Sequence, residues 1–146
     1  TYLAGRSTMS RNNYAESSST ISLRLINLEY KKLKVAIIGY GKMGKIIEGF
    51  LIERGHSISF KIDKENFHQL KDINRENTDV CIEFTGPNSA KANLEILVGN
   101  GMPVVCGSTG WYSELTFIQE LAVKNDTSFV AASNFSIGVN LFFFFF

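Results

Sequence analysis

The 146-residue sequence has little of what a metal site, a disulfide framework or a histidine-based catalytic centre requires. It contains two cysteines and two histidines, and none of them forms a Cys-x-x-Cys or Cys/His spacing. The pattern therefore predicts no metal site. Cys81 and Cys106 are interpreted as buried free thiols of a protein in a reducing compartment, here the cytoplasm. His56 and His68 stand alone, which is more typical of surface or turn positions than of catalytic ones.

A strong excess of charge and long apolar runs are also missing. The formal net charge is +1 at pH 7, which gives no basis for binding nucleic acid or a membrane surface. No apolar run approaches the roughly 20 residues of a membrane-spanning helix. The length suits one domain with a single hydrophobic core.

The two ends of the chain lack the pattern of a folded domain. Residues 1–33 begin without Met and are rich in Ser, Thr, Asn and Arg for most of their length, so we expect a disordered or non-native extension. An organelle transit peptide is the alternative for this stretch. Residues 141–146 contain an unbroken run of five phenylalanines. We interpret this run as the truncated start of a second domain, or as a reading-frame slip.

Between these ends, strand patterns alternate with helix patterns. Apolar, β-branched runs predict strands at residues 34–39, 57–62, 78–84, 103–106 and 128–132. Helices are expected at residues 43–54, after residues 88–89 and after residue 113, with a weakly helical link near residues 67–70. In the first helix, Ile46, Ile47, Phe50 and Leu51 recur at helical spacing, which predicts a buried face. The alternation predicts an α/β fold, a Rossmann-type doubly wound parallel sheet, over residues 34–140.

A glycine-rich turn joins the first strand to the first helix. The sequence Gly-Tyr-Gly-Lys-Met-Gly at residues 39–44 matches the Gly-x-Gly-x-x-Gly fingerprint in the strand–turn–helix context that it needs. Gly39 would permit the tight turn, Gly41 would let the backbone approach a pyrophosphate, and Gly44 would allow close packing of helix and strand. The phosphates would sit at the positive end of the helix.

An acidic residue follows the second strand at the position that the fingerprint requires. Asp63 lies about 20 residues beyond the glycines, where a carboxylate accepts hydrogen bonds from the adenosine ribose. It would repel a 2′-phosphate and so favours NAD over NADP, although Lys64 could soften this preference by offering a cation. The alternative is that Asp63 only caps the segment that follows the strand.

Four small, polar or glycine-rich loops follow the predicted strands, at residues 39–44, 85–87, 107–110 and 133–136. In a parallel sheet these loops share the carboxyl edge, where ligands bind. One such loop is ordinary turn chemistry. Four at one edge suggest space for an extended ligand.

The same segments resemble the dihydrodipicolinate reductase family of the lysine and diaminopimelate pathway. The matching pieces are residues 35–44, Glu-Phe-Thr-Gly-Pro at 83–87, Gly-Ser-Thr-Gly at 107–110 and Ser-Asn-Phe-Ser-Ile-Gly-Val-Asn at 133–140. The last is the most specific, because no general Rossmann rule calls for it. The resemblance covers about residues 34–143, which correspond to the cofactor half of the family and none of the substrate half.

This resemblance implies a set of cofactor contacts. Asp63 would bind the adenosine ribose, and the pyrophosphate would be held by Gly39, Tyr40, Gly41, Lys42, Met43 and Gly44. The rest of the cleft would be formed by Phe84, Thr85, Gly107, Ser108, Thr109, Ala132, Ser133, Asn134 and Phe135, the last four closing the nicotinamide end. Two departures from the family are a glycine turn shorter by one residue and Ser108 in place of the usual threonine.

The implied activity is reduction of 4-hydroxy-tetrahydrodipicolinate to tetrahydrodipicolinate with NADH or NADPH. Catalytic residues are expected beyond Phe146, so the fragment alone is expected to be inactive; the full-length form would bind a small dicarboxylate and assemble as a homotetramer. Two alternatives remain: the cofactor domain of another amino-acid-pathway dehydrogenase, and a non-catalytic NAD(H)-binding module.

Overall fold

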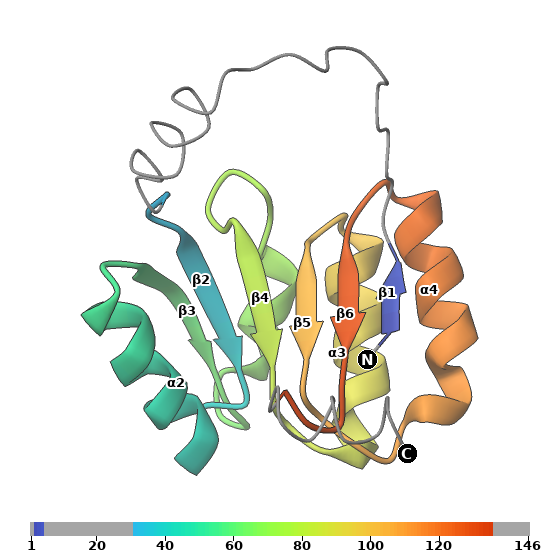
Figure 1. The fold of residues 1–146 in the computed structure, drawn as a ribbon, viewed down its shortest axis with the longest axis horizontal. Helices are drawn as coiled ribbons and strands as arrows, with labels where there is room; N and C mark the ends of the chain where they lie inside the picture. Colours follow the sequence, from blue (N-terminus) through green and yellow to red (C-terminus); the bar gives the residue numbers. More distant parts are fainter. Residues whose placement is uncertain (1, 5–30, 136–146) are drawn as a thin grey trace, which may run out of the picture.

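The computed structural model describes residues 2–4 and 31–135, which form a sheet flanked by helices (Figure 1). Five strands are parallel: β2 (Lys34–Ile38), β3 (Ser57–Ile62), β4 (Val80–Glu83), β5 (Val104–Cys106) and β6 (Phe129–Ala131). The order across the six-stranded sheet is β1-β6-β5-β4-β2-β3, with β1 (Tyr2–Ala4) antiparallel to β6. These strands confirm the predicted alternation.

The connections wind in two directions from the middle of the sheet. The chain passes from β2 through α2 (Lys42–Glu53) to β3, and returns through the 3₁₀ helix η1 (Phe67–Asp72) to β4 on the other side of β2. It then continues outward through α3 (Pro87–Gly99), η2 (Tyr112–Glu114) and α4 (Leu115–Lys124). Right-handed crossovers place α2 on one face and α3 and α4 on the other. The doubly wound α/β fold predicted from the sequence is confirmed.

The buried position of β2 explains its composition. Val35, Ala36, Ile37 and Ile38 are all buried, as expected for a central parallel strand that is covered on both faces. On the α3 side, buried side chains of α3 and α4 complete the core with Trp111 and Phe129, whose rings meet edge to face at 5.9 Å. Among the described residues, no helix has both the length and the apolar character needed to span a membrane.

Helix α2 is less buried than its sequence pattern predicts. Ile46 and Phe50 are 47% and 58% exposed, whereas Ile47 and Leu51 are half-buried. The expectation that all four residues face the core is therefore wrong for Ile46 and Phe50. The reason is the place of the helix: α2 packs on β2 and β3, and β3 is the edge strand of the sheet, so only part of the apolar stripe meets it.

The ends of the chain add one unexpected element. The sequence pattern assigns no strand to residues 1–33, yet Tyr2–Ala4 pairs with β6 through Tyr2–Ala131 and Ala4–Phe129. Pairing of a strand from the far end of the chain is a tertiary event that local sequence does not reveal. The predicted motif residues 136–140 and the phenylalanine run lie outside the described residues.

Candidate cofactor site

A hollow lies at the carboxyl edge of the sheet, where the strand order reverses between β2 and β4. It has a volume of about 800 Å³. This is the crevice in which open α/β sheets bind their ligands. Its walls come from the ends of β2, β3 and β4 and from the first turns of α3: Ile38, Gly39, Tyr40, Gly41, Ile62, Asp63, Lys64, Phe67, Phe84, Thr85, Gly86, Pro87, Asn88, Ser89, Ala92 and Asn93.

The three glycines of the turn have different surroundings. Gly39 has φ +95°, and a Cβ there would lie 2.2 Å from the carbonyl oxygen of Phe84. A Cβ on the buried Gly44 would lie 2.5 Å from the carbonyl oxygen of Gly39. A Cβ on Gly41 would meet no atom within 4 Å. Gly39 and Gly44 are thus needed for the packing of the turn, whereas no described part of the chain requires a glycine at position 41.

The backbone holds this turn against the end of β3. The N–H groups of Gly39 and Tyr40 both donate to the carbonyl oxygen of Ile62, at 2.9 and 3.0 Å. Helix α2 then begins at Lys42 with Gly41 as its N-cap, and no side chain caps it. The first N–H groups of a helix have no intrahelical partner, so this end of α2 can accept an anion.

Asp63 has the structural role that the sequence left open. Its Oδ1 accepts hydrogen bonds from the backbone N–H groups of Glu65, at 2.9 Å, and Asn66, at 3.3 Å. Asn66 in turn accepts from the N–H of Asp63 at 2.7 Å. This reciprocal turn uses one carboxylate oxygen and orients a side chain that is exposed and lines the cavity. Capping therefore does not exclude a ligand role for the other oxygen.

A buried carboxylate supports the loop after β4. Glu83 is fully buried, and its Oε1 accepts from the backbone N–H of Thr85 at 3.1 Å, from the Thr85 hydroxyl and from Asn93 Nδ2 at 3.3 Å. Its Oε2 accepts from Cys106 Sγ at 3.2 Å. Burial raises the pKa of the Cys106 thiol, and the nearby Glu83 charge raises this pKa further, so the thiol remains a donor. The Thr85 hydroxyl is thus oriented by the protein.

The loops after β5 and β6 continue the same edge of the sheet. A Cβ on Gly107 would lie 2.0 Å from the Phe84 ring, so this glycine lets the two loops pack together. Ser108 is buried, and its carbonyl accepts from Trp111 Nε1 at 2.8 Å, while its hydroxyl has no hydrogen-bond partner in the described part of the chain. Ala132 is buried and donates its N–H to the Cys106 carbonyl at 3.2 Å.

The structure brings only part of the predicted set into the cavity. Gly39, Tyr40, Gly41, Asp63, Phe84 and Thr85 line it. The remaining predicted residues do not line it: Lys42, Met43, Gly44, Gly107, Ser108, Thr109, Ala132, Ser133, Asn134 and Phe135. The last seven of these follow β5 and β6, the next strands along the edge.

Sequence reasoning also missed several side chains. Asn88, Ser89, Ala92 and Asn93 line the cavity from α3. The only sequence signal for Asn88 and Ser89 is that they directly follow the Gly-Pro pair that ends a predicted strand. Glu83 had a clearer signal, because an acidic residue ends an apolar strand there.

Comparisons with known proteins agree with this geometry. A family model described as "Dihydrodipicolinate reductase, N-terminus" matches residues 33–135. The 4-hydroxy-tetrahydrodipicolinate reductase of Christiangramia forsetii is 40% identical over 111 residues, which cover 76% of this chain and 46% of that relative. The enzymes of that name from Bifidobacterium longum subsp. infantis and Mycobacterium marinum are 32% and 31% identical over 95 and 112 residues. These two matches cover 64% and 75% of this chain and 37% and 45% of the relatives. The chain thus spans less than half the length of the relatives it matches.

Proposed function

Because this chain belongs to the dihydrodipicolinate reductase family, we propose that residues 34–140 are the NAD(P)H-binding domain of a 4-hydroxy-tetrahydrodipicolinate reductase. In this proposal the full-length protein reduces 4-hydroxy-tetrahydrodipicolinate to tetrahydrodipicolinate in lysine and diaminopimelate biosynthesis. It acts in the cytoplasm as a homotetramer.

The observation that carries the proposal is the open space at Gly41. The glycine turn is closely packed at Gly39 and Gly44, yet a Cβ at position 41 would meet no atom of residues 2–4 and 31–135 within 4 Å. Gly41 also lines the cavity and is the N-cap of α2. The backbone has no side chain at this point, and the N-terminus of the helix that follows is uncapped. A pyrophosphate could therefore approach the free N–H groups.

The adenosine end would be bound by the residues after β3. Asp63 and Lys64 both line the cavity, so an anion and a cation stand side by side where we propose that the ribose binds. The carboxylate accepts from ribose hydroxyl groups and opposes a 2′-phosphate, whereas the ammonium attracts one. We therefore propose that both cofactors bind and that NADH binds more tightly.

The nicotinamide end would lie at the loops after β5 and β6. When bound, NAD(P)H supplies a hydride. Gly107, Ser108 and Thr109 would contact the nicotinamide ribose and carboxamide, and residues 132–135 would close this end. The groups that bind the two substrate carboxylates and donate the proton would belong to the region of the family's enzymes that this chain does not match.

Cofactor binding is tested with a pair of glycine variants. We expect Gly41→Val to abolish NADH binding by the 146-residue chain in calorimetry, because its side chain would occupy the phosphate position. Gly49→Val is the matched control. Gly49 is also exposed and lies in α2, and a Cβ there would meet no described atom within 4 Å. Unlike Gly41, it does not line the cavity. Equal affinity in the two variants would contradict the assigned site.

The reductase assignment is tested by activity. The 146-residue chain is expected to bind NADH but not to oxidise it with the product of dihydrodipicolinate synthase. Orienting the reactants is worth about 7–11 kcal/mol of the barrier, and it requires groups that hold the substrate. Turnover above the Gly41→Val background would show that a substrate site lies within these residues.

A further inference from the structure

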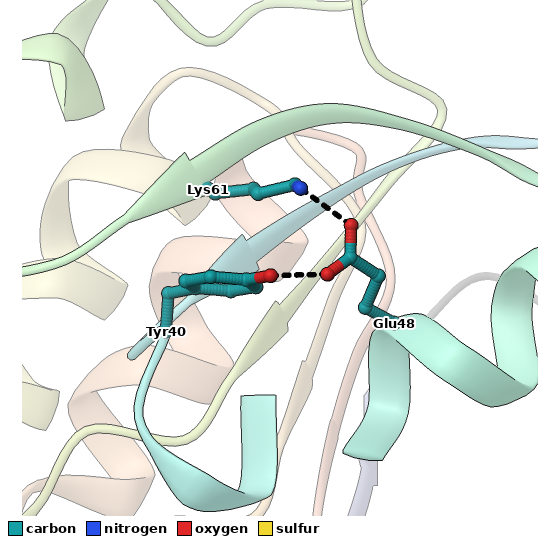
Figure 2. Close-up of polar contacts among 3 residues, drawn as sticks. All are labelled: Tyr40, Glu48 and Lys61. Atoms are coloured by element: carbon teal, nitrogen blue, oxygen red, sulfur yellow. Dashed lines mark hydrogen bonds and ion pairs between the residues drawn. The ribbon is translucent and has the colours of Figure 1, made fainter. Parts of the chain in front are cut away.

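Three polar side chains from three different elements meet beside the glycine turn. Tyr40 belongs to the turn, Glu48 to α2 and Lys61 to β3, and Figure 2 shows the tyrosine hydroxyl and the lysine amino group both reaching the Glu48 carboxylate. The Tyr40 hydroxyl donates to Glu48 Oε2, and Lys61 Nζ lies 2.5 Å from Glu48 Oε1. Lys61 Nζ is also 5.1 Å from the centroid of the Tyr40 ring. We call these residues the Tyr40 cluster.

The Tyr40 cluster joins two segments that the backbone already joins. The N–H groups of Gly39 and Tyr40 bind the carbonyl oxygen of Ile62, the residue immediately before Asp63. Lys61, the residue before Ile62, is tied to Tyr40 through Glu48. The glycine turn and the end of β3 that leads to Asp63 are therefore held together by a main-chain link and by a side-chain link.

Hydrogen bonds within the cluster stabilise the protonation states of Glu48 and Tyr40. Hydrogen bonding from Lys61, and then from Tyr40, lowers the pKa of Glu48, so its carboxylate is charged at neutral pH. The hydrogen bond to Glu48 raises the pKa of Tyr40, so its hydroxyl keeps the proton that it donates. The side chains of Lys61 and Glu48 are 46% and 16% exposed. Solvent weakens such pairs, and a large role in overall stability is not expected.

Only one member of the cluster reaches the cavity. Tyr40 lines it, whereas Glu48 and Lys61 do not. Glu48 and Lys61 therefore act on a ligand through Tyr40 and the turn to which it belongs.

Resting on the proposed cofactor role, we propose that Tyr40, Glu48 and Lys61 are positioning residues that set the separation between the glycine turn and Asp63. A dinucleotide must contact the turn through its pyrophosphate and Asp63 through its ribose at the same time. Adenosine needs only the ribose end. Loss of the cluster should therefore weaken a ligand that spans both points and leave adenosine binding unchanged.

The test compares NADH with adenosine in the 146-residue chain. Tyr40→Phe, Glu48→Gln and Lys61→Met each remove one link and keep most of the side-chain volume. We expect each to weaken NADH about three- to tenfold, which is the effect of one hydrogen bond. Adenosine affinity, measured by NMR titration, should change less than about twofold.

Glu95→Gln is the matched control. Glu95 forms an exposed ion pair with Lys91 at 3.3 Å on α3, and neither residue lines the cavity. This variant should leave both affinities unchanged. Thermal unfolding of every variant identifies any that fails to fold, and the remaining two then carry the comparison.

The outcomes separate this inference from the proposed function. If the unsubstituted chain bound no NADH, the proposed function and this inference would both be wrong. If the unsubstituted chain bound NADH and the three variants bound it with the same affinity, only the positioning role would be wrong. The same conclusion would follow if the variants lost NADH affinity and adenosine affinity equally.

Discussion

The two edges of the sheet differ in the residues that lie beyond the ends of the strands. At the carboxyl edge, glycines and small polar residues leave a cavity of about 800 Å³. At the amino edge, the long side chain of Arg75 crosses between turns. Its Nε donates to the Gly101 carbonyl at 2.8 Å, and its Nη2 donates to the Asp126 carbonyl at 3.1 Å.

At the amino edge the chain's own contacts join neighbouring turns, and the hollow beside them is smaller, about 440 Å³. Gly101 and Asp126 belong to the turns after α3 and α4 and have φ values of +74° and +48°. Arg75 joins the two turns. Nearby, Lys34 and Asp79 exchange hydrogen bonds at 2.8 Å between the beginnings of β2 and β4. The carbonyl groups of Gly101 and Asp126 and the N–H groups of Lys34 and Asp79 thus have partners within the protein.

The difference follows from the direction of the elements. In a parallel sheet the helices begin at the carboxyl edge and end at the amino edge, so helix N-termini gather around the cavity. Side chains that closed the carboxyl edge would take the donors that an anion needs. The comparison predicts that substitutions at the amino edge change stability alone, whereas those at the carboxyl edge can change either stability or binding.

The largest effect is expected for Gly39→Ala. The substitution places a Cβ against the Phe84 carbonyl at a positive φ, and both strain and overpacking oppose it. We expect the free energy of unfolding in urea to fall by about 3 kcal/mol or more. Gly41→Ala, in the same turn, changes only the N-cap of α2, so it should lose about 1 kcal/mol of stability or less, and it should lose NADH affinity. Equal losses of stability in the two variants would contradict the view that Gly39 is needed for packing and Gly41 for ligand binding.

Removing the buried carboxylate is the next largest change. Glu83→Ala removes the acceptor of the Thr85 N–H, and it removes one of the two acceptors of both the Asn93 amide and the Cys106 thiol. The expected loss of stability is about 2–3 kcal/mol, measured by denaturant unfolding. Glu83→Gln should lose less, because one carbonyl oxygen remains. If both variants kept wild-type stability, the network would not support the Thr85 loop.

Asp63 distinguishes binding from capping at the carboxyl edge. Asp63→Ala removes both functions, whereas Asp63→Asn keeps a capping oxygen for Glu65 and Asn66. A charge-assisted hydrogen bond is worth about 1.5–3 kcal/mol, or about 10- to 150-fold in NADH affinity. We expect Asp63→Asn to weaken NADH more than NADPH in calorimetry, at unchanged melting temperature. Equal losses for the two cofactors would leave Asp63 as a cap only.

The smallest effect is expected at the amino edge. Arg75→Met keeps the length of the side chain but removes its two hydrogen bonds to backbone carbonyls. Since the side chain is exposed, the free energy of unfolding should fall by only about 1 kcal/mol. NADH affinity should not change. A change in NADH affinity would show that the two edges are coupled.

The sequence by itself determined the alternation of strands and helices and the position of the glycine turn. These features are local: strands β2 and β3 are continuous apolar or alternating runs, and the turn is a spacing of three glycines. Family membership also follows from short motifs, because each lies within one segment. Asp63 was found in the same way, by its distance from the glycines.

Only the tertiary structure decided what the turn touches and which faces are covered. The contacts of Gly39 with Phe84 and of Glu83 with Cys106 join segments far apart in the chain. The exposure of Phe50 depends on α2 lying over the edge strand, which no helical periodicity reports. Periodicity defines the apolar stripe of a helix, but the neighbours that cover it come from other segments. The joint placement of Tyr40, Glu48 and Lys61 has the same physical origin, since three separate elements must fold together to create it.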